Sequence, residues 1–327
     1  MIPRREFITL LGGAAALWPI AARTQQPERT RHVGVLMGLA DNPLGQTYAA
    51  ALMEGLQALG WTDGRNIRIY LRWAAGSPEK AQAFARELID GRPDLIVAQN
   101  TAMVAAVVQE TRTLPIVFVN VADPVGNGFV ASYPRPGGNI TGFTGYEPSL
   151  AGKWLGLLKE VAPRVNRVAL VFNPDTGPGF TFLRAAEATS SDIKVIAAPV
   201  HSTSEIERAV DELAREANGG LIMVPDNFTA IHRKLIISLC AHYRLPAIYP
   251  FRYIPAEGGL ICYGVDVVDL HHRAASYVDR ILRGAHPSEL PVQSPTKFVM
   301  SINLRTAKTI GLEVPPALLV TADEVIE

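Results

Sequence analysis

The sequence predicts an α/β protein of two doubly wound lobes, each a parallel sheet with helices on both faces. Short apolar runs alternate regularly with amphipathic helical stretches along the 327 residues. The runs are apolar throughout rather than at every second position, which is typical of strands covered on both faces. The alternation restarts after a stretch rich in Gly and Pro at 127–145, which indicates a second lobe.

The first half of the chain contains four predicted strands, at 32–39, 67–73, 94–98 and 115–121. A helix follows the first strand, because Tyr48, Leu52 and Leu56 recur at helical spacing. Ser77 and Pro78 suit the N-cap and first position of a second helix. The helices between these strands are expected to end near 60, 91 and 112.

The second half repeats the first in kind. Its predicted strands lie at 167–172, 193–198, 220–224 and 246–249. Its predicted helices lie at 150–161, 180–190, 203–218 and 229–243. Ile206, Val210 and Leu213 place one apolar face on the third of these helices.

The N-terminus is interpreted as a cleavable export signal over residues 1–24. Arg4 and Arg5 precede an apolar run that is too short, and too broken by Pro19, to span a bilayer. The paired arginines resemble the twin-arginine signal that exports folded proteins; a buried N-terminal helix is the alternative. No later apolar stretch approaches the ~20 residues of a membrane helix. The chain is therefore expected in an aqueous compartment outside the cytoplasm.

The composition argues against nucleic acid as the main partner and against a structure held together by cysteines. The 31 basic and 31 acidic side chains balance, which argues against nucleic acid as the main partner. The two cysteines, Cys240 and Cys262, are too few for a Cys-rich zinc site or a disulfide framework, and their pairing stays open.

Polar residues follow the predicted strands, at the sheet edge where ligands of such folds bind. They include Asn42, Asn100, Thr101, Ala122 and Asp123 in the first half, and Asn173, Asp226 and Asn227 in the second. Asp, Asn and Thr also cap helices and form turns in any such loop, so a purely structural role is the alternative for each residue. As a set they suggest a binding site.

The residue types indicate what this site would hold. The start of the helix at Asn100 and Thr101 offers backbone N–H groups to a carboxylate. Asp123 or Asp226 could meet an ammonium group. Aromatic side chains that could form walls for an apolar body are Tyr146, Phe180, Tyr249 and Tyr263.

Signatures of catalysis are missing from the sequence. It contains no G-x-S-x-G elbow, no Walker A sequence and no G-x-G-x-x-G after the first strand. His271 and His272 point about 100° apart on a helix, so they are interpreted as solvated residues rather than metal ligands. We expect neither enzyme activity nor a metal or cofactor.

Four stretches carry a resemblance to a known family: GWTDGRNIRI at 60–69, ADPVGNGFVASYPRPGGNITGFTG at 122–145, RLPAIYPFRYIPAEGGLICYGVD at 244–266, and LPVQSPTKFVMSINLRTAKTIGLEVPPALLVTADEVIE at 290–327. With them the chain resembles the ABC transporter substrate-binding proteins that include tryptophan/tyrosine-type binding components. The similarity covers essentially the whole chain, and the last two stretches are its most specific part.

The resemblance implies a periplasmic binding protein of type I fold, whose two lobes close on a small organic ligand and deliver it to a membrane permease. It implies one lobe of 32–146 plus about 264–290 and another of about 147–263 plus about 291–327. Hinges are expected near 122–148, 250–266 and 286–297. By position, Gly264 and Asp266 join the ligand-binding residues named above. The protein is expected to be a periplasmic monomer.

The ligand stays open between amino acids and aromatic or other organic acids. Relatives often have a Thr-Pro-Ala type sequence where this chain has Asn100, Thr101 and Ala102, and the loop at 175–182 is Gly-rich here. A ligand-sensing domain that feeds a signalling receptor and an exported enzyme are the alternative functions. A repressor is excluded, because no helix-turn-helix segment precedes His32.

Overall fold

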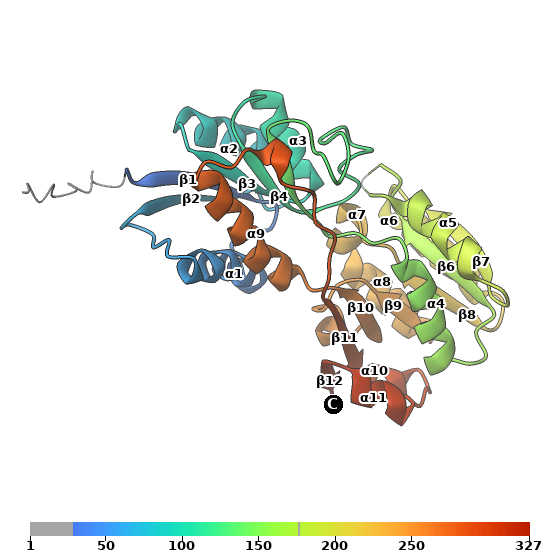
Figure 1. Cartoon of the computed structure of the whole chain (residues 1–327). Helices are drawn as coiled ribbons and strands as arrows, with labels where there is room; N and C mark the ends of the chain where they lie inside the picture. The colour runs from blue at the N-terminus through green and yellow to red at the C-terminus, as the bar shows by residue number, and fades with distance from the viewer. Residues whose placement is uncertain (1–28, 176) are drawn as a thin grey trace, which may run out of the picture.

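The computed structural model describes residues 29–175 and 177–327. Two α/β lobes lie side by side, each built around one sheet, with the chain crossing between them (Figure 1). The predicted export signal at 1–24 lies outside the described residues. Within the described ranges, no helix combines the length and the apolar character needed to cross a membrane.

The first sheet has five parallel strands. In order across the sheet they are β2 (Ile67–Trp73), β1 (Arg31–Met37), β3 (Leu95–Gln99), β4 (Ile116–Val121) and β5 (Ile140–Thr144). The covering helices are α1 (Pro43–Ala58), α2 (Pro78–Asp90), α3 (Thr101–Glu110) and α9 (Val267–Leu282). Helices α1 and α9 pack against each other, as do α2 and α3. Their apolar residues belong to two separate core clusters, so both faces of the sheet are covered.

The second sheet has seven strands. In order they are β12 (Glu324–Ile326), β11 (Phe298–Asn303), β10 (Ile261–Val265), β9 (Ala247–Tyr249), β8 (Gly219–Met223), β6 (Arg167–Phe172) and β7 (Lys194–Pro199). Its helices are α4 (Leu150–Val161), α5 (Gly179–Thr189), α6 (Thr203–Ala214), α7 (Asn227–Ile231), α8 (Arg233–His242), α10 (Leu304–Thr309) and α11 (Pro316–Thr321), with the short 3-10 turn η1 (Pro255–Glu257). A second 3-10 turn, η2 (Pro287–Glu289), follows α9 and contacts β5 of the first lobe. The two-lobe α/β fold predicted from the sequence is confirmed.

Several elements differ from the sequence prediction. Strand β11 runs antiparallel to β10, because the chain returns from α9 in the other lobe and enters the sheet from the opposite end. The helix predicted at 229–243 is broken at His232, which ends α7 and precedes α8. Strand β5 lies inside the Gly-rich stretch, where Gly142 is required: a Cβ there would come within 2.0 Å of the Phe118 carbonyl oxygen.

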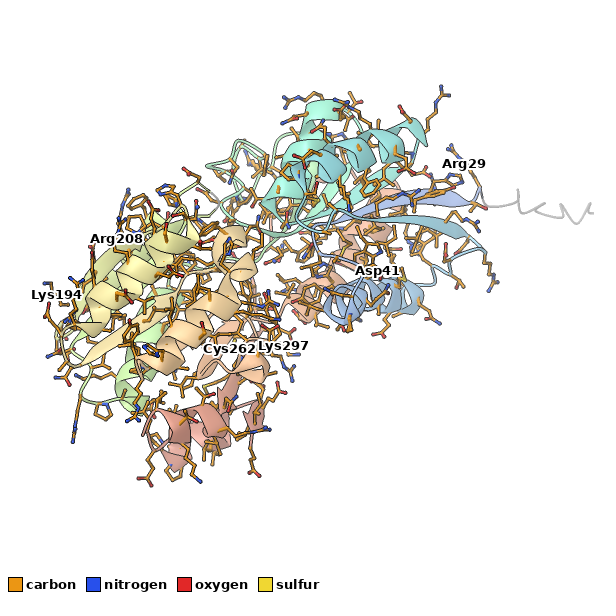
Figure 2. All side chains as sticks on the ribbon, turned by 180° about the vertical axis from the view of Figure 1, so that it is seen from behind. Arg29, Asp41, Lys194, Arg208, Cys262 and Lys297 are labelled. Carbon is orange, nitrogen blue, oxygen red and sulfur yellow. The ribbon has the colours of Figure 1, made fainter. Side chains whose placement is uncertain are left out.

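Three segments of the chain cross between the lobes, at 145–149, at Asp266 and at 290–297. Backbone hydrogen bonds hold them together: Asp266 N donates to Lys297 O at 3.0 Å, and Thr144 N donates to Gln293 O at 2.9 Å. Figure 2 shows Lys297 where the two lobes meet. The crossings overlap the segments predicted as hinges; the hinge motion and the lobe boundaries stay predictions.

The core near the crossings is aromatic. Trp154 of α4 is 1% exposed, stacks on Phe182 with ring centroids 5.2 Å apart, and donates its indole N–H to Tyr263 O at 2.6 Å. Such a large buried ring stabilises the fold by several kcal/mol, about 3–5 by comparison with Trp-to-Ala substitutions. The second lobe is therefore firmly packed beside the point where the chain leaves it.

Candidate functional site

A cavity of about 480 Å³ lies between the lobes. We call it the interlobe cavity. The first lobe lines it with loop residues that follow β1, β2 and β3, including Asn42, Gly76 and Asn100, and with the facing sides of α2 and α3. The second lobe lines it with α7, with Arg233 at the start of α8, and with Tyr253. Its volume suits a small organic molecule.

Parallel strands explain why these loops meet at one edge. The carboxyl ends of β1 and β3 lie side by side, and each leads into a helix that an asparagine caps. Asn42 Oδ1 accepts a hydrogen bond from Gly45 N at 2.9 Å, and Asn100 Oδ1 accepts one from Met103 N at 3.1 Å. Capping thus orients two of the predicted site residues, and both line the cavity.

Asn100 also has a constrained backbone. Its φ is +71°, in the region that non-glycine residues rarely occupy, and Asn120 and Asp123 have φ values of +61° and +39°. All three follow or end strands β3 and β4 on the same edge of the first sheet. Such strain collects at functional sites, because only a firmly packed frame can hold it.

The next three predicted residues hold this edge together. The Thr101 hydroxyl accepts a hydrogen bond from Ala122 N at 3.2 Å and so ties the start of α3 to the end of β4. Ala122 is 5% exposed, and Asp123 Oδ1 accepts a hydrogen bond from Gly126 N at 2.8 Å. None of the three lines the interlobe cavity. Their predicted contact with ligand stays a prediction, and their visible role is to shape the loop.

Asn173 and Asp226, two of the residues predicted in the second lobe, are joined by a hydrogen bond. Asn173 N donates to Asp226 Oδ2 at 2.9 Å, while Asp226 Oδ1 accepts from Thr229 N at 2.7 Å and caps α7. Asp226 is 1% exposed. This carboxylate places the following residue, Asn227, in the lining of the cavity.

Gly264 and Asp266 lie at the second crossing. A Cβ at Gly264 would come within 1.8 Å of the Pro250 carbonyl oxygen, so only glycine fits there. Asp266 caps α9 and forms an ion pair with Lys297 at 2.8 Å. Burial acts to raise the pKa of the Asp266 carboxyl, but hydrogen bonds from Lys297 and from the backbone N–H of Asp269 outweigh it and lower the pKa. Both residues join the crossing segments and do not line the interlobe cavity.

The four aromatic wall candidates lie in different places, none in the lining of the interlobe cavity. Tyr146 lies in the first crossing, and Phe180 is 48% exposed at the start of α5. Tyr263 stacks on Phe298. Tyr249 is 1% exposed inside the core of the second lobe, so its prediction as a wall of the binding site was wrong. A large ring in a strand that leads into a ligand loop fits a core position equally well, and the sequence does not separate the two.

Sequence reasoning missed Arg233 and Tyr253, which line the cavity from the second lobe. The Arg233 guanidinium lies 5.2 Å from the centre of the Tyr253 ring and forms two hydrogen bonds with Glu257, at 2.8 and 2.9 Å. Arg233 was hidden because the sequence predicts one continuous helix through it. The break at His232 puts Arg233 at a helix start, and no periodicity signals that break.

The prediction of a solvated His271 was also wrong. Its ring is fully buried between α1 and α9, where it stacks on Tyr48 with centroids 5.0 Å apart. No local pattern indicates that the helix carrying His271 packs against α1, more than two hundred residues earlier. In the part of the chain that the structure describes, no cluster of His, Cys, Asp or Glu could hold a metal ion, and Cys240 and Cys262 are free thiols.

Comparison with known proteins decides the family. A family model described as ABC transporter substrate binding protein matches residues 32–326. The chain belongs to the ABC transporter substrate-binding protein family. The resemblance read from the four sequence stretches is therefore confirmed, and so is the prediction that the chain is not an enzyme, because this is a family of binding proteins.

Individual relatives agree with this family and fold. A protein named tyrosine-binding protein from Clostridioides difficile is 24% identical over 289 residues, which are 88% of this chain and 82% of that protein. A conserved domain protein from Vibrio cholerae is 27% identical with a TM-score of 0.81, over 91% of this chain and all of that one. An ABC domain from Streptococcus pneumoniae in complex with L-Trp is 24% identical with a TM-score of 0.80, with the same coverage.

Proposed function

We propose that this substrate-binding protein is the exported component of an ABC importer, which closes its lobes on a small organic ligand and delivers it to a membrane permease. The ligand is an amino acid or an aromatic or other organic acid. One observation carries the proposal: the interlobe cavity is lined by Asn42 and Asn100 from one lobe and by Asn227 and Arg233 from the other. A ligand there touches both lobes fully only in a closed state, so it favours closure.

Small-angle X-ray scattering tests closure directly. The purified protein is denatured, freed of co-purified small molecules, refolded, and measured with and without the molecules that mass spectrometry identifies in the denatured extract. We expect ligand to reduce the radius of gyration, and light scattering on the same sample to give a monomer. An unchanged scattering curve at saturating ligand contradicts the clamp mechanism.

Delivery to a permease is tested in cells. Deleting the gene is expected to abolish high-affinity uptake of the identified ligand. A sensor that feeds a receptor would leave uptake unchanged and alter only a downstream response. The two outcomes therefore separate the importer from the alternative considered above.

Export completes the proposal. Replacing Arg4 and Arg5 by lysines is expected to retain the protein in the cytoplasm, because the twin-arginine route requires the pair. Cell fractionation with an antibody measures how much of the protein stays in the cytoplasm, and normal export of the double variant would rule out this route.

A further inference from the structure

The interlobe cavity has an unusual charge pattern. Among the described residues that line it, Arg233 alone carries a formal charge at neutral pH. The other polar side chains are amides and the Tyr253 phenol, and the remaining lining is largely small and apolar. A ligand therefore meets one fixed cation and no carboxylate in this cavity.

The surroundings of Arg233 hold its guanidinium in one orientation. Glu257 accepts from Nε and Nη2, Ala230 O accepts from Nη1 at 2.8 Å, and the Tyr253 ring covers one face. Glu257 itself is not among the residues that line the cavity. Arginine has five N–H donors. Two of them thus have no protein acceptor among the described residues, and the side chain that carries them lines the cavity.

Among the described residues that line the cavity, no acidic group is placed to pair with an ammonium ion. Asp123 accepts from the backbone of its own turn, and Asp226 accepts from Asn173 N and Thr229 N. Neither lines the interlobe cavity. An amino acid bound there would bury its ammonium group without a carboxylate partner, which is costly.

We propose that Arg233 recognises the carboxylate of the ligand, and that the ligand is a monocarboxylic acid with an uncharged, largely apolar body and no ammonium group. This inference rests on the proposed function and narrows its ligand class. Guanidinium and carboxylate form strong charge-assisted hydrogen bonds. The apolar lining and the neutral amides suit the rest of such a molecule.

Matched ligands test the class. Isothermal titration compares indole-3-propionate with tryptophan, 3-phenylpropionate with phenylalanine, and 4-methylpentanoate with leucine, so each pair differs only in the amino group. The neutral 3-phenylpropionamide isolates the carboxylate charge. We expect at least one acid to bind about 10- to 100-fold more tightly than its amino acid, and 3-phenylpropionate to exceed its amide similarly. Tighter binding of the amino acids, or binding of none of the acids, overturns the inference.

Variants test the residue. Arg233→Gln is expected to remove the preference for the acid over the amide. Arg233→Lys keeps a positive charge and is expected to retain part of that preference. Glu257→Gln is the matched control: it breaks the same ion pair but leaves the guanidinium. If Glu257→Gln loses acid binding as fully as Arg233→Gln, the pair is structural and the proposal fails. The scattering experiment with the co-purified ligand tests the proposed function independently, so failure of the Arg233 proposal does not imply failure of the closure mechanism.

Discussion

Protonation of His271 should set the acid stability of the first lobe. Its Nδ1 lies 2.8 Å from Val267 O, an acceptor, so Nδ1 carries the proton and the neutral ring leaves Nε2 as the bare nitrogen. Nε2 is buried and has no hydrogen-bond partner within the described structure. A proton added there would create a buried cation without a counter-charge. Burial therefore lowers the pKa of His271 to about 4, against the opposing hydrogen bond to Val267.

The pH window follows from this direction. In the unfolded chain the imidazole takes up a proton as pH falls through 6.5, whereas the buried ring does so only near pH 4. The unfolded state binds more protons between these values, so stability is complete above pH 6.5 and falls as the solution is acidified. At about 1.4 kcal/mol per unit, going from pH 7.5 to 5 should remove about 2 kcal/mol through this one residue.

Urea unfolding at pH 7.5, 6 and 5 measures the effect in the wild type and in His271→Phe, which keeps a ring against Tyr48 but cannot titrate. The free energy of unfolding should fall about 2 kcal/mol more in the wild type over this range. His272→Phe changes the exposed neighbour and should leave the pH dependence unaltered. Parallel curves for wild type and His271→Phe would refute the reasoning.

Three further predictions concern packing. Gly264→Ala places a Cβ 1.8 Å from the Pro250 carbonyl oxygen and should cost about 1–3 kcal/mol or more in urea unfolding; an unchanged midpoint would contradict the close approach. Gly156→Ala, in the interior of α4 with no atom within 4 Å of the new Cβ, should instead stabilise by about 0.5–1 kcal/mol in the same assay. Cys240 and Cys262 are buried, and burial raises the pKa of Cys240 to about 12, so Ellman's reagent should label neither thiol until the protein is denatured.

Local patterns predicted most of the first half of the fold. The strand ending at Gln99 and the helix starting at Thr101 were predicted closely, because an apolar run, an Asn cap and a helical repeat all act within a dozen residues. The C-terminal third was harder. The antiparallel strand β11 and the packing of α9 on α1 depend on where the chain returns after crossing between lobes, which no local periodicity encodes.

The residues of the candidate site were likewise predictable from the sequence only in part. Asn42, Asn100 and Asn227 could be selected in advance, because ligand loops follow parallel strands and all three line the cavity. Arg233 and Tyr253 could not, since a break at one histidine and a turn after β9 bring them there.

The sequence by itself determined the α/β class, the two-lobe organisation and the family, because strand and helix periodicity and four long sequence stretches are written in neighbouring residues. Only the tertiary structure decided which polar residues are structural caps, which face the cavity, and that His271 is buried. Burial and charge pairing are sums over contacts between segments far apart in the chain, and those contacts exist only once the lobes have folded.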